Sequence, residues 1–122
     1  MSRGRNAAWQ LPTPEQRELL RVVLLADFPN RNAIATHLDE IRVQPDFARS
    51  SGIYEFRLPT RLELEPQEWP VFLSGASTTG IQALVLLFAR DGRDFQIEIA
   101  PFDDGAFGRI IPATITEPES ES

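Results

Sequence analysis

The sequence predicts an α+β fold in which an N-terminal helical hairpin packs on one face of a four- to five-stranded, mainly antiparallel sheet. Two observations lead to this prediction. Apolar residues recur at helical spacing in the first third of the chain, and they alternate with polar residues from the middle onwards. The chain has 122 residues, which is enough for one domain with one modest core.

The first helix is predicted to begin at Thr13. Thr13 is suited to the N-cap, Pro14 to the first helical position, and Gln16 completes a capping box. The apolar residues that follow at helical spacing are Leu19, Leu20, Val23 and Leu24. Phe28-Pro29 is expected to end this helix, because proline cannot continue the hydrogen-bond ladder.

A second helix is predicted after the short link, with Asn30 as its cap. Its apolar face consists of Ile34, Leu38 and Ile41. A link this short favours two helices packed as a hairpin. Residues 43–52 are expected to form a loop.

Alternating residues predict the strands. Tyr54, Phe56 and Leu58 give the first strand a buried face, and Leu62 and Leu64 predict a short second strand. Residues 71–76 predict a third strand, and residues 66–70 a connector, since they include two prolines.

The last two strands are predicted to form a hairpin around Asp91-Gly92, a pair typical of a two-residue type I′ turn. That turn pairs Phe88 with Phe95, Leu86 with Ile97 and Leu84 with Ile99, and these six side chains are expected to face the core. The other face then carries an aliphatic stripe rimmed by polar side chains, which can mark an interface. The candidate partner-binding residues are Trp69, Ile81, Val85, Leu87, Gln96 and Glu98.

The stripe has a simpler interpretation, in which another part of the chain covers it. The candidates are Trp9 and Leu11 from the N-terminal arm, or Phe102, Phe107, Ile110 and Ile111 near the C-terminus. The predicted organisation is an irregular arm over residues 1–12, one α+β domain over 13–111 and an acidic, disordered tail over 112–122.

Composition excludes several chemistries. The chain has no cysteine, so it cannot form a disulfide, a thiolate nucleophile or a cysteine-bound zinc site. It has no lysine, which excludes a Schiff-base lysine and a phosphate-binding P-loop. No signal peptide or membrane-spanning run is apparent, so we expect a cytoplasmic protein with no membrane association.

The net charge is −6, and residues 43–122 hold six arginines against thirteen acids. This excess disfavours nucleic-acid binding and favours a basic protein surface as the partner. The charge can also serve solubility alone.

The candidates for chemistry are weak. His37 is the only histidine, and Asp39 and Glu40 beside it do not both converge with it on one helix face. Asp103-Asp104-Gly105 is typical of a turn. We therefore predict no catalytic residues, no metal site and no cofactor.

Two stretches carry a resemblance, LPTPEQRELLRVVLLADFPNRNAIATHL and TTGIQALVLLFARDGRDFQIEIAPFDDG. Together they resemble a family of small bacterial domains of unknown function. The resemblance covers most of residues 11–105 and rests on the Phe28-Pro29-Asn30-Arg31 break, on Val85-Leu86-Leu87 and on the Arg90-Asp91-Gly92-Arg93 turn. It implies a helical hairpin followed by a closing β-hairpin, and it implies no catalytic residues.

The predicted function is a non-enzymatic protein-binding module, in its sharpest form an immunity protein or inhibitor that masks a bacterial toxin with a basic surface. One alternative is a small enzyme or ligand-binding domain that uses His37 and nearby acids. Another is a self-associating protein, a homodimer for example, that uses the face of Ile81, Val85 and Leu87.

Overall fold

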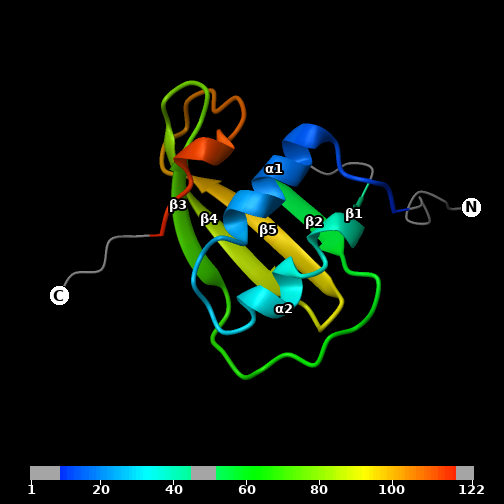
Figure 1. Cartoon of the computed structure of the whole chain (residues 1–122). Helices are drawn as coiled ribbons and strands as arrows, with labels where there is room; N and C mark the ends of the chain where they lie inside the picture. Colours follow the sequence, from blue (N-terminus) through cyan, green and yellow to red (C-terminus); the bar gives the residue numbers. More distant parts are fainter. Residues whose placement is uncertain (1–8, 45–51, 118–122) are drawn as a thin grey trace, which may run out of the picture.

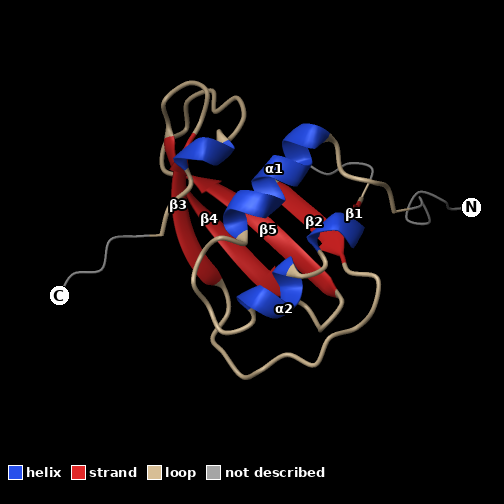
Figure 2. Ribbon diagram, viewed as in Figure 1, coloured by secondary structure: helices blue, strands red, loops and turns tan. Residues whose placement is uncertain are grey.

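The computed structural model describes residues 9–44 and 52–117, which form an α+β fold with one five-stranded antiparallel sheet (Figure 1). Its elements are α1 (Pro14–Val23), α2 (Arg31–Ala35), β1 (Arg42–Val43), β2 (Ile53–Arg57), β3 (Val71–Ala76), β4 (Gln82–Ala89) and β5 (Asp94–Pro101). Two 3₁₀ turns, Leu38–Glu40 and Pro112–Thr114, complete it. The strand order is β1-β2-β5-β4-β3, and α1 lies across one face of the sheet (Figure 2).

The start of α1 confirms the predicted capping box. The Gln16 N–H donates to Thr13 Oγ1 at 3.2 Å, and the Thr13 N–H donates to Gln16 Oε1 at 2.8 Å. Two otherwise unpaired amides at the helix start are thereby satisfied. The helix ends at Val23, ahead of the Phe28-Pro29 break.

The predicted pairing of two helices is not confirmed, because α2 is only a five-residue helix followed by a 3₁₀ turn. Residues of low helix propensity, including Asn32, Thr36 and His37, follow its start. The Thr36 hydroxyl donates to the Asn32 carbonyl at 2.7 Å, a contact that competes with regular helix. Ile34 and Ile41 are nevertheless fully buried, as the apolar spacing predicts.

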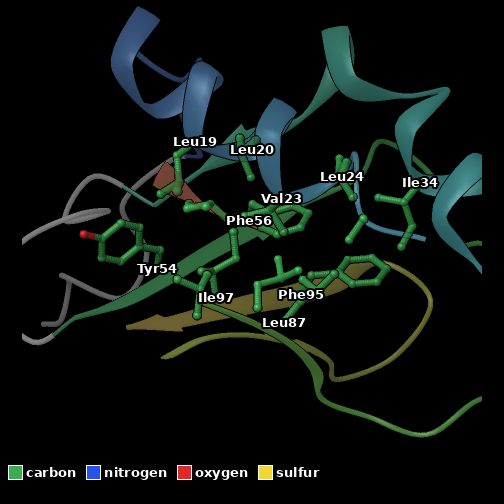
Figure 3. Close-up of a cluster of buried hydrophobic side chains, with 14 of the residues drawn as sticks. Leu19, Leu20, Val23, Leu24, Ile34, Tyr54, Phe56, Leu87, Phe95 and Ile97 are labelled. Atoms are coloured by element: carbon green, nitrogen blue, oxygen red, sulfur yellow. The ribbon is translucent and has the colours of Figure 1, made fainter. Parts of the chain in front are cut away.

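The core lies between α1 and the sheet. Figure 3 shows Leu20 and Val23 of α1 above Phe56 of β2 and Phe95 of β5. The two phenyl rings are stacked, with centroids 5.3 Å apart and planes 13° from parallel. Burying such side chains is the main favourable term in folding, so this cluster anchors α1 to the sheet.

The predicted register of the last hairpin is wrong by one residue. Val85 lies opposite Ile99 and Leu87 opposite Ile97, and all four side chains are buried. A slip of one residue moves every side chain of a strand to the other face. The core face of β5 was therefore predicted correctly, whereas on β4 the two faces are exchanged.

The turn accounts for this shift. The Arg90 N–H donates to the Asp94 carbonyl at 2.9 Å, so residues 91–93 form the loop instead of Asp91-Gly92 alone. Asp91 Oδ1 accepts the N–H groups of Arg93 at 2.8 Å and Asp94 at 2.9 Å. The backbone N–H groups of Asp94 and Arg93 lower the pKa of Asp91 to about 2.

Gly92 is required because a side chain would not fit at this position, and not because its φ is positive. The glycines with positive φ in the described chain are Gly52, Gly80 and Gly108. A Cβ on Gly92 would lie 1.9 Å from the carbonyl oxygen of Leu62, whose own N–H donates to the Gly92 carbonyl at 2.8 Å. The hairpin tip is thus held by a distant segment that a local turn rule does not consider.

The segment between β2 and β3 does not form the predicted short strand. Leu62 and Leu64 are partly buried against the core from an irregular path. The side chain of Asn30, which is 2% exposed, bonds to this segment at Glu65 and Gln67. Since Asn30 makes no side-chain cap bond to α2, its predicted capping role is replaced by this long-range one.

Both edges of the sheet are extended by short bridges. Gln10 of the N-terminal arm pairs with Val43, and Thr116 pairs with Ser74. Ile115 is buried, so the packed part of the chain continues beyond the predicted boundary at residue 111. The remainder of the predicted tail, residues 118–122, and most of the predicted loop over 43–52 lie outside the described residues.

Candidate functional site

The sheet has a second face, directed away from α1, which we call the outer face. Its side chains alternate with the buried ones along each strand. On β2 and β5 they are Ile53, Glu55, Arg57, Asp94, Gln96, Glu98 and Ala100, and on β3 and β4 they are Phe72, Ser74, Ala76, Leu84, Leu86 and Phe88.

The centre of the outer face is apolar apart from one carboxylate. One row across the sheet runs from Phe72 to Leu86, Glu98 and Ile53, since each is the cross-strand partner of the next. Phe72 is 53% exposed and Ile53 is 39% exposed. Leu84, in the adjacent row, extends this surface. The four apolar residues form the patch that we call the apolar centre.

Charged side chains gather at one end of the outer face, where they neutralise one another. Arg57 Nε donates to Asp94 Oδ1 at 2.6 Å, and this hydrogen bond raises the pKa of Arg57. The Arg57 guanidinium also lies 4.3 Å from the ring centroid of Trp9, a cation–π contact. Arg90 lies 3.4 Å from Glu55. Trp9 of the N-terminal arm thus contacts the charged end of the outer face, while Phe72 stays exposed.

Glu98 differs from these charged residues. Within residues 9–44 and 52–117 it makes no ion pair or side-chain hydrogen bond, and its neighbours across the sheet are Leu86 and Ile53. Its carboxylate is therefore a single negative charge in an apolar surrounding.

The predicted partner-binding residues are separated by the structure. Val85 and Leu87 have no exposed surface, so they cannot contact a partner from the folded chain. Ile81 lies on the same side of β4 and is partly buried. Gln96 and Glu98 do lie on the outer face, as predicted.

Trp69, the remaining candidate, packs against the edge of the core. Its ring makes an edge-to-face contact with Phe28, with centroids 6.2 Å apart. Trp69 therefore covers an edge of the core. Of the covering residues proposed near the C-terminus, Ile110 packs beside Gly75 on the inner side, Phe107 packs against the core, and Phe102 is exposed.

Leu84 and Leu86 were missed as surface residues because β4 is apolar on both faces. When one strand offers Ala83, Val85 and Leu87 on one side and larger side chains on the other, a period of two cannot decide which side is buried. The three-residue loop over 91–93 sets the register, and the Leu62 N–H supports that loop by donating to the Gly92 carbonyl, a contact that no local pattern signals.

The predicted acid–base candidate is a surface pair. His37 Nδ1 lies 2.8 Å from Glu40 Oε1, while Asp39 turns away to form an ion pair with Arg17. In the described part of the chain, no three side chains of the His, Cys, Asp and Glu types cluster closely enough to hold a metal ion. Use of His37 by an enzyme stays a prediction.

The fold and this site define a small α+β protein whose antiparallel sheet has one face covered by α1 and an outer face with an exposed apolar centre. Comparison of the chain with protein-family models, curated proteins and solved structures found no match. The resemblance to small bacterial domains therefore stays a prediction. None of the helices in residues 9–44 and 52–117 is long and apolar enough to cross a membrane.

Proposed function

We propose that this chain is a non-enzymatic protein-binding module that docks its partner on the outer face of the sheet. The observation that carries the proposal is the exposure of Phe72, which is 53% open beside Leu86 in the apolar centre. Apolar patches rimmed by polar residues mark interaction surfaces in monomeric proteins. Aromatic side chains on such patches supply much of the binding energy.

The sharper form of the proposal is an inhibitor or immunity protein that covers a basic toxin in the cytoplasm. The net charge of −6 supports it, because opposite charges accelerate encounter between two proteins. Such steering is screened by salt over about 8 Å at physiological ionic strength. An association rate that falls steeply with added salt is expected, and a rate independent of salt would contradict this form.

The test compares three tagged full-length chains in capture experiments from the native cells. Phe72→Asp alters the apolar centre, while Leu25→Asp introduces the same charge at a 59% exposed position that follows α1. We expect a stoichiometric partner to be captured by the wild type and by Leu25→Asp and lost from Phe72→Asp. Circular dichroism must show that both variants fold. Identical capture by all three chains, or no capture by any, counts against the proposal.

Self-association is the second candidate, because an exposed apolar patch can pair with its own copy. The surface originally predicted for it is excluded, since Val85 and Leu87 are buried. Sedimentation velocity distinguishes the candidates. A wild-type dimer that Phe72→Asp converts to monomer supports self-association, and a monomeric wild type supports a different partner.

A further inference from the structure

Glu98 lies within the apolar centre without a partner among the described residues. We infer that the partner docked on this face is a protein that presents a lysine or arginine side chain to Glu98 from within an apolar surface. The inference rests on the proposed function and specifies the chemistry of the partner.

Position makes contact with Glu98 unavoidable. Glu98 lies directly between Leu86 on β4 and Ile53 on β2. Side chains opposite one another on neighbouring strands have Cβ atoms about 5 Å apart. A partner that covers both Phe72 and Leu86 therefore also covers or closely borders the Glu98 carboxylate and removes water from it.

Removing water from a carboxylate is unfavourable unless a cation or several hydrogen bonds replace that water. A partner surface with no cation at this point is therefore rejected, whereas one with a lysine or arginine gains an ion pair shielded from solvent. Glu98 thus selects among apolar surfaces, and Phe72 and Leu86 supply contact area.

The chain's own arginines on this face do not meet the requirement. Arg57 and Arg90 are already paired with Asp94 and Glu55. Arg57 lies opposite Asp94, four residues along β5 from Glu98, which is about 13 Å at the rise of an extended strand. Arg42, the other arginine on this face, donates to the Glu40 carbonyl. Within residues 9–44 and 52–117 no arginine pairs with Glu98, so the cation of the proposal comes from the partner.

A second copy of this chain fits poorly. In a two-fold interface the same patch faces itself, so a dimer centred on Leu86 brings the two Glu98 carboxylates together. Like charges in a dehydrated interface repel. Charge complementarity therefore favours a different, cationic partner.

The test uses a defined probe, a display library of a small helical scaffold with randomised surface positions. The library is selected on the wild-type full chain, and binders that also recognise Phe72→Asp are discarded. We expect the remaining binders to carry a lysine or arginine at the contact. They should bind Glu98→Gln at least tenfold more weakly than the wild type. When the lysine or arginine of the binder is replaced by methionine, the wild type and Glu98→Gln should be bound with equal affinity. Asp104→Asn changes an exposed acid in the segment that follows β5, and as the matched control it should leave binding unchanged.

The outcomes separate the two proposals. If the binders need Phe72 but bind Glu98→Gln and the wild type with equal affinity, the inference is overturned and the proposed function stands. A selection that yields no binder dependent on Phe72 overturns the proposed function and the inference with it. A wild-type dimer that Glu98→Gln tightens overturns the inference in favour of a second copy.

Discussion

The side-chain amide of Asn30 binds both backbone polar groups of Glu65. Its Oδ1 accepts the Glu65 N–H at 2.7 Å, and its Nδ2 donates to the Glu65 carbonyl at 2.9 Å. Asn30 therefore hydrogen-bonds to the Glu65 backbone as a neighbouring strand would, although it lies 35 residues earlier in the chain. The same Nδ2 also donates to Gln67 Oε1 at 2.7 Å. One buried side chain thus ties the turn before α2 to the irregular segment that leads into β3.

Asn30→Ala should lower the free energy of unfolding by about 2 kcal/mol, because it leaves buried polar groups without partners. Urea denaturation followed by circular dichroism measures the loss. Asn32→Ala is the control, since Asn32 is exposed, and it should stay within about 0.5 kcal/mol of the wild type. Equal losses in the two variants would show that the bonds of Asn30 contribute nothing particular.

Leu86 and Leu87 test the register of the hairpin directly. Leu87 is fully buried, so Leu87→Ala should cost about 3 kcal/mol, whereas Leu86→Ala on the outer face should cost about 1 kcal/mol. The register of a two-residue turn predicts the reverse order. Urea midpoints of the two alanine variants decide between them, and a larger loss for Leu86→Ala would falsify the register described here.

Two glycines should respond differently to substitution. Gly80 has φ +88° and no neighbour within 4 Å of an added Cβ, so its requirement is conformational. Gly80→Ala should cost about 1 kcal/mol, and Gly80→Asn should cost less because asparagine tolerates the left-handed region. The requirement at Gly92 is space beside Leu62, so alanine and asparagine should both be costly there, by about 1–3 kcal/mol. Thermal melts of the four variants measure this, and a rescue by asparagine at Gly92 would contradict the steric explanation.

Tyr54 is the only tyrosine in the chain, so its ionisation can be followed by absorbance near 295 nm. Burial, and to a lesser extent the Glu15 carboxylate, raise the pKa of Tyr54 above its usual value of 10. The folded protein should therefore titrate at higher pH than the protein in 6 M guanidinium, which is the control.

Ionisation of Tyr54 makes the stability of the fold depend on alkaline pH. The pKa of Tyr54 is higher in the folded state than in the unfolded state. Its contribution to the free energy of unfolding is therefore complete below the unfolded pKa near 10 and is lost as the pH rises through the folded pKa. Tyr54→Phe should remove this part of the alkaline destabilisation. Superimposable titration curves for folded and unfolded protein would contradict the predicted shift.

The sequence by itself determined the local features. The capping box at Thr13 and Gln16 and the buried faces of β2 and β5 depend on residues close together in the chain, so their spacing predicts them. The candidate surface was only partly predictable: Glu98 and Gln96 were placed on the right face, and Phe72 was not recognised.

The tertiary structure decided which face of β4 is buried and where Asn30 makes its bonds. Both depend on the segment between β2 and β3, which carries no repeating pattern and meets Gly92 through Leu62 and Asn30 through Glu65. A strand that is apolar on both faces buries a similar apolar area in either of two registers. Its own pattern therefore does not select the register, and the selection depends on contacts outside the strand. That selection places Leu86 beside Phe72 and Glu98 on the outer face, and so determines the surface that a partner meets.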